Sequence, residues 1–220
     1  MSRAFDAVLF DCDGVLVDSE FITCGALRDC LADIGWEMSL AACMAQFVGH
    51  TVRSQQALIE AQTGQPFREE WLEGFLRLRN ERLAQSLEAV PGILGAVTHL
   101  HQALAGQIAV ASGADRFKIE MMLGKVGLRP FFEGRMFSGQ ETPRNKPHPD
   151  VYLAAAAHVQ VDPARCLVLE DTPVGVTAGV AAGAEVWGFA TLGQDEVLRT
   201  AGAARVFAHM SELPTLFVST

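Results

Sequence analysis

Short apolar runs alternate with longer stretches of helical periodicity along most of the chain. The apolar runs indicate strands at residues 7–10, 107–111, 135–138, 166–169, 185–189 and 205–207. Helical patterns lie between them, at residues 93–105, 115–126, 149–158 and 173–182. Because strands that alternate with helices normally pair in parallel, this order predicts an α/β protein with a doubly wound, Rossmann-like parallel sheet.

The interval between the first and second predicted strands is much longer than one crossover connection needs. Its apolar and charged residues follow helical patterns at residues 21–34, 40–46, 52–63 and 68–86. Pro91-Gly92 marks the return to the sheet. We therefore expect an α/β core domain formed by residues 1–18 and 89–220, with a small helical domain, residues 19–88, inserted after the first strand.

Composition narrows the classes of partner and location. Half of the 220 residues are hydrophobic, which permits a sizeable core, and the formal net charge of −9 argues against binding to nucleic acid or an anionic membrane. No apolar run approaches the roughly 20 residues of a membrane span, and the N-terminus lacks a secretory pattern. The five cysteines are scattered and form no Cys-x-x-Cys pair, so we expect a reducing, cytoplasmic location.

Two aspartates follow the first predicted strand. Asp11 and Asp13, in Asp11-Cys12-Asp13-Gly14-Val15, come directly after the apolar run at residues 7–10. Parallel sheets place ligand sites at this end of their strands, and a divalent cation would relieve the repulsion between two carboxylates there. An ordinary Asp-Gly turn is the alternative, because both residue types suit turns.

Polar residues also follow three later predicted strands. Ser112-Gly113 can offer a hydroxyl and backbone N–H groups to an anion, or the serine can simply cap a helix. Lys146 lies among prolines that restrict its backbone, although an exposed lysine before a helix explains it equally well. Glu170 and Asp171 supply oxygen ligands for a hard cation such as Mg²⁺, and Asp171 could also cap the next helix.

Together these groups suit phosphoryl transfer, in which a carboxylate attacks phosphorus while a metal ion and a lysine neutralise its oxygens. The order Asp-x-Asp-Gly-Val, Ser-Gly, Lys-Pro-x-Pro and Glu-Asp resembles the haloacid dehalogenase superfamily of phosphohydrolases. The long insertion resembles the branch with a helical cap, which includes β-phosphoglucomutase and the sugar-phosphate phosphatases. Within that branch, three segments most resemble the 6-phosphogluconate phosphatases: Phe10-Asp11-Cys12-Asp13-Gly14, Val17-Asp18-Ser19-Glu20 and Phe137-Ser138-Gly139.

The resemblance implies a role for each motif residue. Asp11 would be the nucleophile that forms an aspartyl-phosphate. Asp13 would protonate the leaving oxygen and then activate water. Ser112, Gly113 and Lys146 would hold the transferring phosphoryl group. The second aspartate favours phosphate esters over carbon–halogen bonds, because the dehalogenases that name the superfamily lack it.

The resemblance also implies a Mg²⁺ site. Asp11 and Asp171 would bind the ion with their carboxylates, and Asp13 would bind it through its backbone carbonyl. Glu170 would join as a direct or water-linked ligand.

In relatives the helical cap supplies specificity, so its matching residues become candidate substrate contacts. Those in the loop at residues 47–53 and on the following long helix are Gly49, His50, Thr51, Arg53 and Arg77. The alternatives are ordinary ones. Arg77 and Arg79 could lie on a solvated helical face, and His50 could cap the helix that begins near Thr51.

The resemblance is compatible with three functions: a phosphatase, a phosphosugar mutase and a non-catalytic sensor. Thr23 stands where β-phosphoglucomutase has a histidine, and Ala114-Asp115 stands where it has Ser-Lys. These departures favour hydrolysis over the transfer of phosphate within a sugar that a mutase catalyses. A non-catalytic phosphosugar sensor would show an eroded motif set, whereas all the expected residues are present. We expect a small phosphorylated metabolite as partner, and a monomer or a homodimer.

Overall fold

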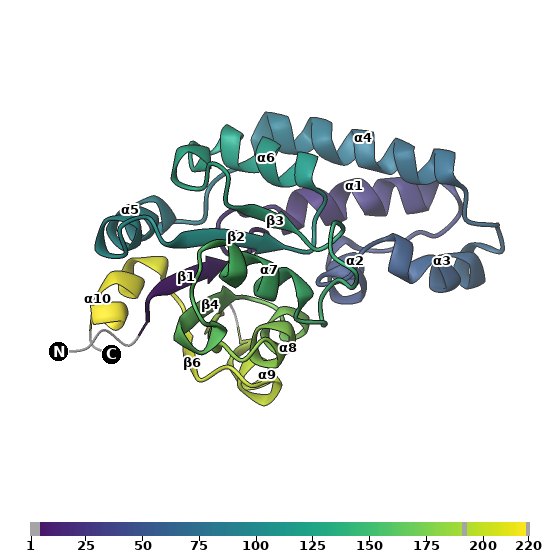
Figure 1. Ribbon diagram of the computed structural model, residues 1–220. Coiled ribbons are helices and arrows are strands. Elements are labelled where there is room, and N and C mark those ends of the chain that lie inside the picture. Colours follow the sequence, from purple (N-terminus) through teal and green to yellow (C-terminus); the bar gives the residue numbers. More distant parts are fainter. Residues whose placement is uncertain (1–4, 191–192, 219–220) are drawn as a thin grey trace. The chain divides into compact units, whose positions relative to one another are not determined.

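The computed structural model describes residues 5–190 and 193–218, which form two compact units (Figure 1). One unit contains the chain up to Val17 and again from Ala89. The other is the continuous segment Asp18–Glu88, which begins one residue before the expected insertion.

The first unit is built on a six-stranded parallel sheet in the order β3-β2-β1-β4-β5-β6. The strands are β1 (Ala7–Phe10), β2 (Ile108–Ser112), β3 (Met136–Ser138), β4 (Cys166–Glu170), β5 (Glu185–Phe189) and β6 (Arg205–Phe207). Each lies within one residue of its predicted bounds at either end. The sequence predicted them well because β1, β2 and β4 are buried throughout and therefore read as continuous apolar runs.

Helices cover both faces of this sheet. They are α5 (Ile93–Ala103), α6 (Arg116–Lys125), α7 (Asp150–His158), α8 (Pro173–Ala181), α9 (Asp195–Ala201) and α10 (Leu213–Val218). Figure 1 shows α5 and α6 on one side of the sheet and α7 and α8 on the other, as right-handed crossovers require for this strand order. The short helices α9 and α10 were not predicted, because a helix of two turns carries little periodicity.

Strand register places the candidate residues at one edge of the sheet. Phe10 at the end of β1 pairs with Val110 of β2 and with Leu169 of β4. The residues that follow all three strands therefore emerge side by side. On one face, Leu9 packs in a core cluster with Val151 of α7 and Val176 of α8, which holds this edge rigidly.

The second unit is wholly helical within the described residues. It contains α1 (Glu20–Asp33), α2 (Leu40–Phe47), α3 (Gln56–Thr63) and α4 (Glu69–Ser86), packed around their own apolar cluster. The predicted helix at residues 52–63 was too long at its start: a 3₁₀ turn, Arg53–Gln55, precedes α3. Thr51 accounts for this turn, because its hydroxyl accepts a hydrogen bond from the Ser54 amide at 3.2 Å.

Two further observations bear on the expectations drawn from composition. Among the helices of residues 5–190 and 193–218, none has the length and apolar character needed to cross a bilayer. All five cysteines are free thiols.

Candidate active site

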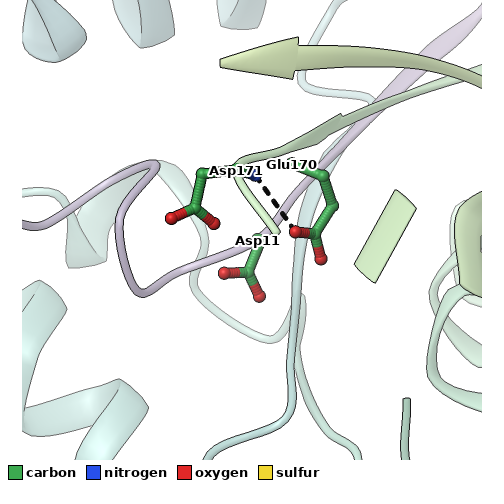
Figure 2. Close-up of side chains that lie close together, drawn as sticks. All are labelled: Asp11, Glu170 and Asp171. Carbon is green, nitrogen blue, oxygen red and sulfur yellow. Dashed lines mark hydrogen bonds between the residues drawn. The ribbon is translucent and has the colours of Figure 1, made fainter. Parts of the chain in front are cut away.

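Three carboxylates meet where β1 and β4 end. Asp11 follows β1, Glu170 is the last residue of β4, and Asp171 follows it. Each offers an oxygen atom within 4.8 Å of the others (Figure 2). The backbone N–H of Asp11 donates to Leu169 O at 2.9 Å, which extends the β1–β4 pairing to the site.

The turn after Asp11 is part of this arrangement. The Gly14 amide donates to Val17 O at 2.9 Å and the Leu16 amide donates to Cys12 O at 3.0 Å, so the chain turns tightly between Cys12 and Val17. Gly14 has a φ of +78°, and a Cβ atom at this position would overlap the Asp171 carboxylate. The turn and the acidic site are therefore one structure, and glycine is needed both for the backbone conformation and for the close approach.

Lys146 links two of the carboxylates. Its Nζ lies 2.6 Å from Asp11 Oδ1 and 2.7 Å from Glu170 Oε1, and its side chain is only 8% exposed. Burial opposes its charge, but Asp11 and Glu170 hold the pKa of Lys146 well above its ordinary value. The alternative of an exposed lysine before a helix is wrong, because the side chain turns inward to two buried acids.

Opposing effects act on the pKa of the Asp11 carboxyl group. Burial raises the pKa of its carboxyl group; Lys146 opposes this shift, and the negative charges of Glu170 and Asp13 add to it, so the pKa is about 7. A cation bound beside Asp11 would favour the ionised form, which is the form that can attack phosphorus.

Glu170 is completely buried and bonded on both oxygens. Oε1 accepts from Lys146 and from the Tyr152 hydroxyl, each at 2.7 Å. Oε2 accepts from the amides of Asp171 and Thr172 and from the Thr172 hydroxyl. The N-cap of α8 is Thr172, whose hydroxyl accepts from the Gly175 amide, so the alternative that Asp171 caps this helix is wrong. The Asp171 carboxylate belongs to the acidic cluster instead.

Ser112 and Gly113 lie at the end of β2. The buried Ser112 hydroxyl accepts from the Ala114 amide at 3.1 Å. It does not cap α6, since Asp115 occupies that position and accepts from the Lys118 amide at 2.8 Å. The alternative reading of Ser112 as a helix cap is therefore wrong, because α6 begins later than that reading requires.

Asn145 was missed in the sequence, although it joins two predicted motifs. Its Nδ2 donates to Gly113 O at 3.0 Å, and its Oδ1 accepts from the Lys146 amide at 2.8 Å. The side chain thus ties the β2 loop to the loop that carries Lys146. Its position directly before the lysine was the available signal.

Lys118 and Tyr152 were also missed. Lys118 Nζ lies 2.6 Å from Asp13 Oδ1. Tyr152, the only tyrosine of the chain, contacts Glu170, and its ring lies beneath Lys146, with Nζ 4.7 Å from the centroid. Both residues lie inside helices. The sequence around a polar residue in a helix does not indicate that its side chain will reach the end of a distant strand.

The remaining candidates belong to the helical unit. Gly49 has a φ of +81°, as a close turn requires. His50 is exposed and caps neither the 3₁₀ turn nor α3, whose N-cap residues are Val52 and Gln55. Arg53 makes a two-bond ion pair with Glu69, at 2.7 and 2.6 Å. The loop is thus braced within its own unit.

On α4 the two candidate arginines differ. Arg77 is exposed, as expected for a solvated face or a substrate contact. Arg79 is buried, so a solvated face is wrong for this residue. Its guanidinium lies 5.9 Å from the centre of the Phe75 ring and donates to Asn80 Oδ1.

The charges of the core site suit a divalent cation. The site contains four carboxylates, those of Asp11, Asp13, Glu170 and Asp171, and two ammonium groups, those of Lys118 and Lys146, which pair with the first three. If all are ionised, two negative charges remain. The acidic cluster offers oxygen ligands, which hard cations such as Mg²⁺ prefer.

The chain belongs to the haloacid dehalogenase-like hydrolases, whose family model matches residues 5–183. It is 30% identical over 218 residues to 6-phosphogluconate phosphatase of Escherichia coli (strain K12), covering 99% of this chain and 96% of that protein. It is also 31% identical over 182 residues to hexitol phosphatase B of the same strain, covering 82% and 81%.

A solved structure agrees with this placement. The HAD family hydrolase from Deinococcus radiodurans R1, determined with bound phosphate and sodium, superimposes with a TM-score of 0.81 at 30% identity. The match covers 99% of this chain and 97% of that chain. The expected superfamily and its α/β fold are confirmed.

Proposed function

We propose that this protein is a Mg²⁺-dependent phosphatase that hydrolyses small phosphorylated sugars or sugar acids. The observation that carries the proposal is the buried Asp11 carboxylate, held 2.6 Å from Lys146 beside Glu170 and Asp171. The names of the two relatives, a 6-phosphogluconate phosphatase and a hexitol phosphatase, support the class of substrate.

In the first step an oxygen of Asp11 attacks phosphorus. The bond between phosphorus and the ester oxygen breaks, and Asp13 gives its proton to the leaving oxygen. Lys146, the Ser112 hydroxyl and the Gly113 amide bind the phosphoryl oxygens. The product is an aspartyl-phosphate on Asp11 and the free alcohol.

In the second step Asp13 accepts a proton from water as the water oxygen attacks the same phosphorus. The bond between phosphorus and the Asp11 oxygen breaks, which releases inorganic phosphate and restores the carboxylate. Asp13 ends the cycle protonated and ready to act as an acid again.

Asp11, Asp171 and the Asp13 carbonyl would hold Mg²⁺, with Glu170 as a direct or water-linked ligand. When bound, the ion supplies positive charge that stabilises the phosphoryl oxygens and the ionised form of Asp11. Glu170 already accepts five hydrogen bonds, which favours the water-linked arrangement.

Hydrolysis is favoured over the phosphosugar mutase reaction. The position where β-phosphoglucomutase has a lysine is Asp115, and its carboxylate caps α6. It therefore offers an anion in place of a cation that could grip a second phosphate.

The helical unit Asp18–Glu88 would act as the cap that selects the substrate. Its candidate contacts are Gly49, His50, Thr51, Arg53 and Arg77. The exposed His50 and Arg77 are the strongest of these, because Arg53 is paired with Glu69. A reducing cytoplasm suits such an enzyme, and its partner would be a small phosphorylated metabolite.

The test is phosphate release from a panel of sugar and sugar-acid phosphates, with Mg²⁺ and with a chelator. We expect metal-dependent release concentrated on one or two substrates. Conversion of glucose 1-phosphate to its 6-isomer without phosphate release would contradict the proposal and identify a mutase. Saturable binding of a phosphosugar with neither reaction would identify a sensor.

A further inference from the structure

Lys118 makes a contact that the motif residues do not explain. Its Nζ lies 2.6 Å from Asp13 Oδ1, and its side chain is 8% exposed while that of Asp13 is 25% exposed. A nearly buried ammonium group is costly unless a charged partner compensates for its lost water. The fold therefore commits a buried cation to the aspartate that the proposed reaction uses for proton transfer.

The backbone of Lys118 is anchored at the start of α6. The Asp115 carboxylate accepts from the Lys118 amide at 2.8 Å and so fixes the first turn of the helix. Just before it, the Ser138 hydroxyl donates to Ala114 O at 2.6 Å. Because β2 lies beside β1 in the sheet, this anchored turn can reach the loop that carries Asp13.

The two lysines of the site serve different aspartates. Lys146 contacts Asp11 and Glu170, whereas Lys118 contacts Asp13. Lys118 stands four residues after Ala114 along the chain and belongs to none of the four motifs. Its contact is thus additional to the groups that would bind phosphate and metal.

We propose that Lys118 is the positioning residue of Asp13, an inference that rests on the proposed phosphatase function. The ammonium group engages Oδ1 and holds the side chain in one rotamer. Held in this way, the carboxylate keeps one orientation toward the leaving oxygen and then toward the attacking water. Lys118 acts through Asp13 and does not itself contact the substrate.

The first experiment compares Lys118→Met with Lys125→Met, the same change at the exposed end of the same helix. Both variants are assayed as the full chain with Mg²⁺ on the best sugar phosphate. Because general acid–base catalysis contributes about 10²- to 10⁴-fold, we expect kcat of Lys118→Met to fall about 10- to 100-fold with KM changed less than about threefold. Lys118→Arg retains the cation and should recover part of kcat, whereas Lys125→Met should match the wild type.

The second experiment uses 4-nitrophenyl phosphate, whose leaving group needs little protonation. In Lys118→Met the aspartyl-phosphate should still form, but its hydrolysis should be slow. We therefore expect a burst of 4-nitrophenolate close to one per active site, followed by slow turnover. Asp13→Asn should give the same pattern, and adding Lys118→Met to it should cause no further loss.

The results that would overturn the inference are distinct from failure of the proposed function. A kcat of Lys118→Met within about twofold of the Lys125→Met value would refute positioning. So would a reduced burst with a lowered melting temperature that Lys118→Arg does not correct, because that combination marks a structural role. If Lys118→Met does not fold, Lys118→Gln is measured by the same criteria. A wild type that releases no phosphate from any substrate would refute the phosphatase proposal, and this inference with it.

Discussion

Gly175 in the first turn of α8 faces the Glu170 carboxylate with no room for a side chain between them. A Cβ atom on Gly175 would overlap the carboxylate carbon and both oxygens. Glu170 cannot move aside cheaply, because Lys146, Tyr152 and Thr172 bond both of its oxygens. The buried acid of the site and the helix behind it therefore depend on a glycine outside the four motifs.

Gly175→Ala should destabilise the protein, because the added methyl group forces either Glu170 or α8 to shift. Overpacking of this kind costs about 1–3 kcal/mol. Gly124→Ala on α6 is the matched control. A Cβ there meets nothing within 4 Å, and alanine in an exposed helix should stabilise by up to about 1 kcal/mol. Urea unfolding measures both, and equal effects of the same sign would contradict the packing argument.

Without metal, the free energy of unfolding should depend on pH through the ionisation of Asp11. Its pKa is raised from 3.8 in the unfolded chain to about 7 in the folded protein. The folded state therefore retains a proton that the unfolded state loses, so this group's contribution is present below pH 4 and is lost as the pH rises through 7.

Asp11→Asn removes this titration. In chelator, the variant should match the wild type near pH 4 and become more stable than it near pH 8, by on the order of a few kcal/mol. Added Mg²⁺ should stabilise the wild type more than the variant. Urea unfolding across this pH range is the measurement. A stability difference between the two proteins that stays constant with pH would contradict a raised pKa for the buried Asp11 carboxyl group.

Asp13→Asn should sharply reduce turnover and leave the fold intact, since the amide can neither give nor accept the required proton. We expect a loss of about 10²- to 10⁴-fold in kcat on the best sugar phosphate. Asp6→Asn is the control, because Asp6 forms an exposed ion pair with Arg165 and such pairs contribute little. Steady-state kinetics with circular dichroism would decide, and near-normal turnover in Asp13→Asn would remove its assigned role.

His50→Ala and Arg77→Ala should change the preference among substrates more than they change folding. Both side chains are exposed on the helical unit, so their loss disturbs little packing. Arg68→Ala, an exposed change just before the start of α4, is the control. The measurement is the ratio of kcat/KM between pairs of sugar phosphates. Equal losses on every substrate would argue against a role in selection.

The sheet and most helices could be predicted because their signals are local. Strands buried on both faces read as apolar runs, and long helices show their period within one segment. The exceptions have local reasons as well. The short helix α9 is too brief for periodicity, and the start of α3 is altered by the Thr51 hydroxyl.

By itself, the sequence determined which residues stand at the ends of β1, β2 and β4, because each strand is a local apolar run that ends at a polar residue. Parallel pairing then brings those ends to one edge of the sheet. Only the tertiary structure decided which side chains meet there. Lys118 and Tyr152 reach the site from inside helices, and Asp171 joins the acidic cluster while Thr172 caps α8. The physical reason is that such contacts depend on helix rotation and side-chain direction across distant segments, which no local pattern encodes.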